Sequence, residues 1–187
     1  ILAAGLVLAG CSTGPVESTS PQSTTAPSVT EDSNSADVMF AQMMVPHHVQ
    51  AVEMSDVILA KDGIDPRVIT LAEEIKAAQQ PEIDALNGML KSWGMPQAST
   101  DGMAMDHGGS MDGMMTEEDM AALDAATGTE ASRLFLEQMI VHHEGAVEMA
   151  KIEVDSGTNP DAVAMAQAII DTQNIEIKTM REILQSL

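Results

Sequence analysis

One segment occurs twice in this sequence of 187 residues, and the repeat is the strongest constraint on how the chain folds. Residues 40–54 read FAQMMVPHHVQAVEM, and residues 135–149 read FLEQMIVHHEGAVEM. In both copies the apolar residues recur about every 3.6 positions, which is the period of an amphipathic α-helix. We therefore expect each copy to form a helix with one buried face.

A second repeated pattern follows each copy. The motif Ile-x3-Gln-x2-Glu-Ile begins at Ile75 and again at Ile169. Residues 63–66 and 157–160 separate the two patterns in each half, and both turns carry a glycine that ends a helix, a polar cap and a proline suited to a first helical turn. The sequence thus predicts two helical hairpins, with helices over residues 37–61, 66–93, 130–155 and 160–185.

Two hairpins with one apolar face each can bury those faces against each other, so the predicted fold is an all-α four-helix bundle. The length suits one domain, which we place at residues 37–187. Between the hairpins, residues 94–115 are rich in Gly, Met and Asp and are expected to form a loop. Thr116 then caps a short extra helix that ends at about Ala126.

The first residues resemble the end of a bacterial lipoprotein signal peptide. Residues 1–11 are apolar, too short to span a membrane, and end in the lipobox-like run Leu-Ala-Gly-Cys. We expect Cys11 to carry a lipid that anchors the protein outside the cytoplasm, on the bacterial cell membrane. Residues 12–36 are rich in Ser, Thr and Pro and are expected to be a disordered tether. With Cys11 modified, imidazoles and thioethers are the remaining soft and borderline metal ligands.

The charge and the missing motifs exclude several functions. A net charge of -21 repels phosphate backbones, so nucleic acid is not an expected partner. The sequence has no glycine-rich phosphate loop, no nucleophile elbow and no thiol for catalysis. These absences favour a binding protein over an enzyme.

The two double histidines predict a metal site. A Met lies three residues before the first His of each pair and another lies seven residues after it, so the thioethers share the helix face of the imidazoles. Thioethers with imidazoles suit Cu(I), whereas di-iron bundles use Glu-x-x-His, which does not occur here. The predicted ligands are Met44, His47, His48 and Met54, and in the second copy Met139, His142, His143 and Met149. Whether the pairs form one site or two stays open, since Val141 replaces Pro46 in the second copy.

Each hairpin is expected to place polar groups opposite its histidines, since these groups lie about as far after the turn as the histidines lie before it. They are Gln79 and Glu82 in the first hairpin, and Gln173 and Glu176 in the second. A ligand histidine needs such an acceptor for its second N–H, although a purely structural core histidine would use the same contact.

The loop is a second candidate copper site. Its possible ligands are Met103, Met105, His107, Met111, Met114 and Met115. The alternative is a linker whose methionines have no role.

On these motifs the chain resembles the family called domain of unknown function 305. The resemblance rests on Met-x2-3-His-His-x2-Ala-hydrophobic-x-Met, followed by Gln-x2-Glu-Ile, and it covers about Asp37 to Leu187 in both halves. It implies a ferritin-like fold and copper-binding members located outside the cytoplasm. It also implies that His47, His48 and Met54, with His142, His143 and Met149, are the functional positions.

The leading hypothesis is therefore a lipid-anchored, extracytoplasmic protein that sequesters Cu(I) or hands it on, in copper homeostasis or resistance. The metal ion is its expected partner, with an unidentified copper-handling protein as a second one. Two alternatives stay open: a ferritin-like oxidase that uses copper or iron, and a metal-independent helical interaction module.

Overall fold

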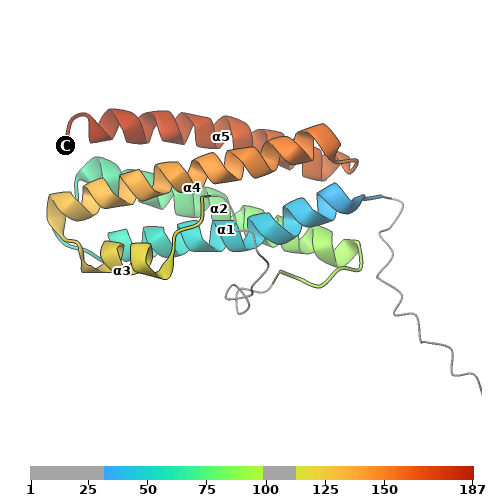
Figure 1. The fold of residues 1–187 in the computed structure, drawn as a ribbon, viewed down its shortest axis with the longest axis horizontal. Coiled ribbons are helices and arrows are strands. Elements are labelled where there is room, and N and C mark those ends of the chain that lie inside the picture. The colour runs from blue at the N-terminus through green and yellow to red at the C-terminus, as the bar shows by residue number, and fades with distance from the viewer. Residues whose placement is uncertain (1–31, 99–112) are drawn as a thin grey trace, which may run out of the picture.

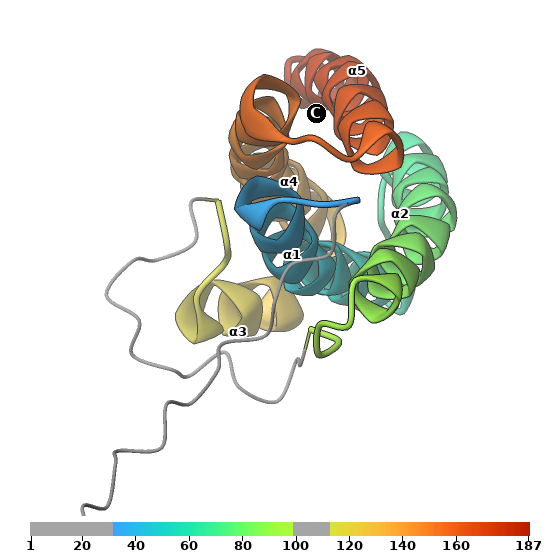
Figure 2. The same ribbon diagram turned by 90° about the vertical axis from the view of Figure 1, so that its right-hand side faces the viewer.

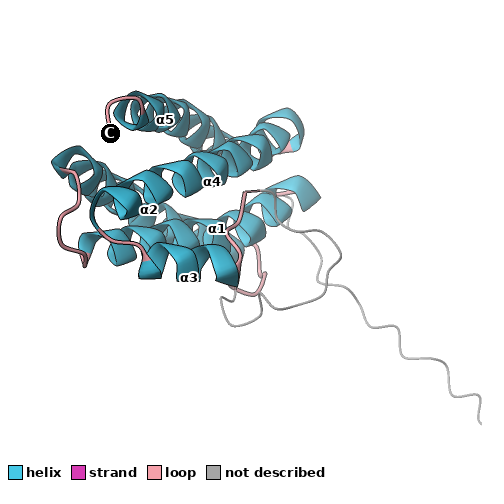
Figure 3. Ribbon diagram, turned by 60° about the vertical axis from the view of Figure 1, so that its left-hand side comes forward, coloured by secondary structure: helices cyan, strands magenta, loops and turns pink. Residues whose placement is uncertain are grey.

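The computed structural model describes residues 32–98 and 113–187, and within these ranges it contains helices and loops but no strand (Figure 3). The long helices pair in sequence order as two hairpins, with one short helix between them (Figure 1). The helices are α1 (Ser35–Leu59), α2 (Pro66–Ser92), α3 (Glu117–Ala125), α4 (Gly128–Ser156) and α5 (Pro160–Leu184). The predicted all-α bundle of two hairpins with a short extra helix is confirmed.

The four long helices surround a common centre, as the end view in Figure 2 shows. α1 packs on α2 and α4 packs on α5 within the hairpins, while α1 and α4 make most of the contact between them. α2 and α5 touch each other less. α3 lies outside the bundle against α1 and α4.

The helix ends follow the predicted signals closely. Asp65 and Asn159 cap α2 and α5, and a proline follows each of them at the first helical position. α1 begins two residues earlier than predicted, because the side chain of Asn34 accepts hydrogen bonds from the main-chain N–H groups of Ala36 and Asp37. The last residues assigned to the tether are therefore helical. α1 continues without interruption through Pro46.

The buried apolar residues form two cores, one at each end of the bundle. The α3-side core includes Ile75, Phe135 and Leu123 of α3. The Trp93-side core includes Phe40, Ile83, Ile169 and Trp93. α1 passes from the Trp93-side core into the α3-side core and α4 passes the opposite way, so the two copies of the repeat are antiparallel. They are related by a pseudo-twofold axis through the middle of the bundle.

Several sequence predictions lie outside the described residues. They are the signal peptide remnant with Cys11, the tether up to residue 31, and four residues of the Met-rich loop: Met103, Met105, His107 and Met111. Within residues 32–98 and 113–187, no helix is long and apolar enough to cross a membrane.

Candidate metal centre

The four paired histidines meet between the two apolar cores. The ring centroids of His47, on α1, and His142, on α4, are 3.8 Å apart with an angle of 41° between the ring planes. The centroids of His142 and His143 are 6.4 Å apart. The side chains of all four, which we call the histidine layer, are fully buried: His47, His48, His142 and His143. The two copies of the motif thus contribute to one place in the fold.

The position of this layer follows from the pattern of the sequence. On α2, Gln79 and Glu82 lie between Ile75 of the α3-side core and Ile83 of the Trp93-side core. α5 repeats this arrangement in the opposite direction around Gln173 and Glu176. Polar residues at the middle of all four helices therefore stack into one layer when the apolar residues on either side are buried.

Two carboxylates hold the outer histidines. Nε2 of His48 lies 2.8 Å from Oε2 of Glu82, and Nε2 of His143 lies 2.7 Å from Oε2 of Glu176. A carboxylate accepts hydrogen bonds, so each imidazole donates from Nε2, and in its neutral form the ring keeps its lone pair at Nδ1. Within the described residues, Nδ1 of His48 and Nδ1 of His143 have no hydrogen-bond partner. Buried acceptors of this kind are what a metal ion would use, so the residues present fit a bound cation.

Gln79 and Gln173 are buried in the same layer, with 2% and 3% of their surface exposed. Oε1 of each amide, and Nε2 of Gln79, has no hydrogen-bond partner in the part of the chain that the structure describes. The two glutamines therefore lie at the expected height, but the hydrogen bonds to histidine come from the glutamates.

His142 is held in its neutral form. Burial lowers its pKa well below the ordinary value of 6.5, and the neighbouring His47, His143 and His48 lower it further. A main-chain hydrogen bond with His47 acts in the opposite direction and is weaker. A neutral imidazole is the form that binds metals, so the layer does not have to lose a proton from His142 before it can accept a cation.

The predicted methionines lie on both sides of the histidine layer. Met54 and Met139 belong to the α3-side core, and Met44 belongs to the Trp93-side core, where Met149 packs against it. The first three are fully buried, whereas Met149 is half-buried. Among the described residues, no three His, Cys, Asp or Glu side chains form a group that could hold a metal ion. Thioether sulfurs would therefore have to complete the coordination of an ion held by these imidazoles.

Two further residues were missed by the sequence analysis. Gln50 forms two hydrogen bonds with the main chain of Met115. Nε2 of Gln50 donates to the carbonyl oxygen of Met115 at 2.9 Å, and Oε1 of Gln50 accepts from the N–H of Met115 at 2.7 Å. Gly113 has a φ of +89° and packs against α4. Residues 113–115, which we call the strap, contain Met114 and Met115 of the predicted Met-rich loop. The sequence contained one sign of this contact, because Gln50 in the first copy of the repeat corresponds to Gly145 in the second.

The glutamates of the repeat that could have served as an acid–base pair lie outside the site. Glu53 and Glu148 are exposed on α1 and α4, and Glu148 bonds Lys151 one turn away. The arrangement of buried imidazoles, carboxylates and thioethers therefore offers coordination of a cation as its main chemistry.

Comparison with known proteins agrees with the sequence motifs. The family described as domain of unknown function (DUF305) matches residues 37–184. None of the curated proteins matches the sequence significantly. A DUF305 fragment from Deinococcus radiodurans is similar in structure, with a TM-score of 0.74 and 32% identity over 83% of this chain and 99% of that one.

Two further structures extend the comparison. A DUF305 protein from Streptomyces coelicolor, described as secreted, has a TM-score of 0.72 and 33% identity over 81% of this chain and 91% of its own. CopM in its Cu(II)-bound form has a TM-score of 0.69 and 31% identity over 80% of this chain and 96% of its own. CopM has also been solved in Cu(I)-bound and Ag-bound forms. The family match covers all four long helices and the histidine layer, and the chain therefore belongs to the DUF305 family.

Proposed function

We propose that this protein binds copper, as Cu(I), at the histidine layer between its two apolar cores. The observation that carries the proposal is the convergence of four buried imidazoles, two of which are fixed by a glutamate at Nε2 and present a bare Nδ1. The copper-bound and silver-bound forms of CopM support it, since that protein shares the fold at about one third identity.

The ligand set favours Cu(I) over harder ions. Imidazoles lie in the layer and thioethers lie on both sides of it, and soft sulfur ligands select Cu(I). Zn²⁺ sites are usually completed by Cys, His or carboxylate, whereas the further side chains on both sides of the imidazoles here are thioethers. The glutamates are already bonded to His48 and His143, where they orient the rings.

The cellular role that we propose is to sequester Cu(I) outside the cytoplasm, or to hand it on, from a position on the membrane. A lipid on Cys11 would provide the anchor, and residues 12–31 the tether. The acidic surface supports this role, because a net charge of -21 raises the local concentration of cations. The protein acts as a binder in this proposal and carries out no reaction on the ion.

A competition titration tests the proposal. The Cys11-truncated protein is titrated with Cu(I) in the presence of a chromophoric Cu(I) chelator under reducing, oxygen-free conditions. Replacing His47, His48, His142 and His143 together by Ala is expected to lower the affinity by about a hundredfold or more, beyond what the loss of a supporting hydrogen bond costs. The comparison variant is His107→Ala, which removes the one histidine outside the layer and so reports on the loop as a separate candidate site. Equal affinity in the fourfold variant and the wild type would refute the proposal.

Thermal unfolding gives a second readout that also reports on folding. A ligand that binds only the folded state adds about 2.7 kcal/mol of stability at a hundred times its Kd. Cu(I) should therefore raise the Tm of the wild type and of His107→Ala, and leave that of the fourfold variant unchanged. A cooperative transition of the fourfold variant without metal shows that it folds, so a lost shift reflects lost ligands.

A further inference from the structure

The strap contacts both α1 and α4 close to the histidine layer. Gln50, which bonds the main chain of Met115, lies one helical turn after His47. A Cβ added to Gly113 would lie 2.8 Å from the carbonyl oxygen of Val141 and 2.9 Å from the Cα of Gly145. Val141 and Gly145 flank His142 and His143 on α4. The strap is therefore hydrogen-bonded to α1 and packed closely against α4, the two helices that carry the histidines.

The two copies of the repeat differ where the strap and α3 dock. Met43, Pro46 and Gln50 of the first copy are replaced by Gln138, Val141 and Gly145 in the second. Gln138 donates a hydrogen bond to the main-chain carbonyl of Asp119 on α3, at 2.9 Å. Gly145 leaves room for Gly113, and Gln50 supplies the hydrogen bonds that hold Met115. The histidines and the methionines beside them are the same in both copies, so Gln50, Gly145 and Gln138 serve the connection rather than the layer.

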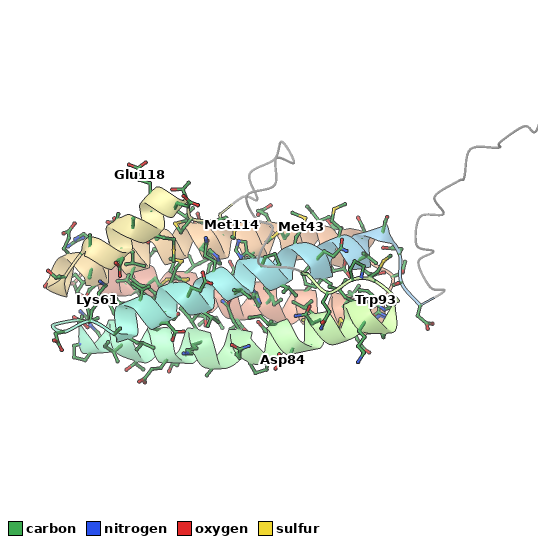
Figure 4. All side chains as sticks on the ribbon, turned by 90° about the horizontal axis from the view of Figure 1, so that it is seen from below. Met43, Lys61, Asp84, Trp93, Met114 and Glu118 are labelled. Atoms are coloured by element: carbon green, nitrogen blue, oxygen red, sulfur yellow. The ribbon has the colours of Figure 1, made fainter. Side chains whose placement is uncertain are left out.

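The strap adds a sulfur to one side of the layer only. Met115 is half-buried and packs against the α3-side core, which already contains Met54 and Met139. The Trp93-side core has Met44 and Met149 near the layer and receives nothing from the strap. Figure 4 labels Met114, the neighbouring strap residue, along the same edge of the bundle as Met43 of α1.

We propose that Met115 is a further thioether ligand for Cu(I) on the α3 side of the histidine layer, and that Gln50 is the residue that positions it. The inference rests on the proposed function. It assigns Met115, which the sequence grouped with the loop ligands, to the buried site. The two hydrogen bonds between Gln50 and Met115 fix the main chain of Met115 and restrict where its sulfur can lie. A soft metal ion is the chemical class that this group would recognise.

Cu(I) competition titrations of single and double variants test the inference. Met115→Leu keeps the volume of the side chain and removes the sulfur, while Gln50→Ala removes the hydrogen bonds. Each is expected to lower the Cu(I) affinity about tenfold, which is the lower end of the effect of groups that support a metal site. The double variant should lose no more than either single one, because both changes act through the same sulfur. Unchanged affinity in Met115→Leu would overturn the inference, while the fourfold histidine variant reports separately on the proposed function.

Two controls separate positioning from general loosening. Gln138→Ala removes a glutamine hydrogen bond of the same length to the same connecting segment, and Met120→Leu removes the sulfur of a half-buried methionine of α3 that packs against the same core. Neither is expected to change the affinity, and a tenfold loss in either would overturn the inference. Hydrogen exchange of the metal-free protein gives a readout without copper. The N–H of Met115 should lose protection in Gln50→Ala and keep it in Gln138→Ala, and retained protection in Gln50→Ala would overturn the role of Gln50.

Discussion

Two buried carboxyl groups, Asp37 and Glu153, join the start of α1 to the end of α4. Asp37 accepts hydrogen bonds from the main-chain N–H groups of Asn34, Thr158 and Asn159 and from the hydroxyl of Thr158. Burial acts to raise the pKa of Asp37, but these bonds and one from Glu153 lower it overall. Burial raises the pKa of Glu153 to about 8, with the hydrogen bond to Asp37 and its charge adding to the effect. Glu153 is therefore protonated at neutral pH and donates to Asp37.

This pair predicts a pH dependence of stability. The folded pKa of Glu153 is raised above its ordinary value of 4.5, so the folded state holds a proton that the unfolded state has lost between pH 4.5 and about 8. Stability should therefore fall as pH rises through this window, by up to about 1.4 kcal/mol per pH unit. Glu153→Gln should flatten the dependence, because an amide donates to Asp37 at every pH. Tm measured from pH 5 to 8.5 checks this.

The matched control is Glu148→Gln, which makes the same substitution at an exposed position of the same helix. Its pH dependence should match that of the wild type. The same slope in Glu153→Gln and the wild type would show that the buried acid is not the titrating group. Below pH 4, every variant should lose stability, because the pKa of Asp37 is lowered and its hydrogen bonds weaken when it is protonated.

At the scale of helices, the start of α1 depends on Asn34. Its side-chain oxygen accepts from the N–H groups of Ala36 and Asp37, and its side-chain nitrogen donates to the carbonyl of Ser156 at the end of α4. Asn34→Ala should lower the free energy of unfolding by about 1 to 2 kcal/mol, the usual effect of removing a helix cap. Urea denaturation checks this, with a lower midpoint and an unchanged m value. Ser35→Ala, an exposed change one residue away, should leave the midpoint where it is in the wild type.

The arrangement of the helices was predictable from local pattern, because turns and apolar periodicity are encoded within each hairpin. The contact of Glu82 with His48 follows from equal distances to the turn at residues 63–66. The strap was not predictable in the same way, since Gln50 and Met115 lie 65 positions apart with no periodic pattern between them. Glu153 was missed for another reason. A lone glutamate in an acidic sequence is normally solvated, and only the fold reveals that Asp37 shares its proton.

The whole molecule carries 29 acidic against 8 basic residues, and the excess negative charges repel one another in the folded state. Raising NaCl from about 0.01 to about 1 M shortens the screening length from about 30 Å to about 3 Å. We expect Tm to rise by at least about 5 °C, or about 2 kcal/mol for a chain of this size. Calorimetry across the salt series measures the shift. At about pH 4, where half of the carboxylates are protonated, the rise of Tm with salt should be smaller than at neutral pH. An equal rise at the two pH values would contradict electrostatic repulsion as the cause.

The strap belongs to the single segment that joins the two hairpins, so it has no symmetry-related counterpart in the other half. Two separate copies of one hairpin could pair with identical faces on either side of the histidines. Within one chain, Gln50 faces the strap from one copy and Gly145 faces it from the other. Substitutions in the strap can therefore alter one side of the bundle while the histidines of both halves stay the same. The connecting segment and the residues that receive it make the two sides of a duplicated hairpin unequal.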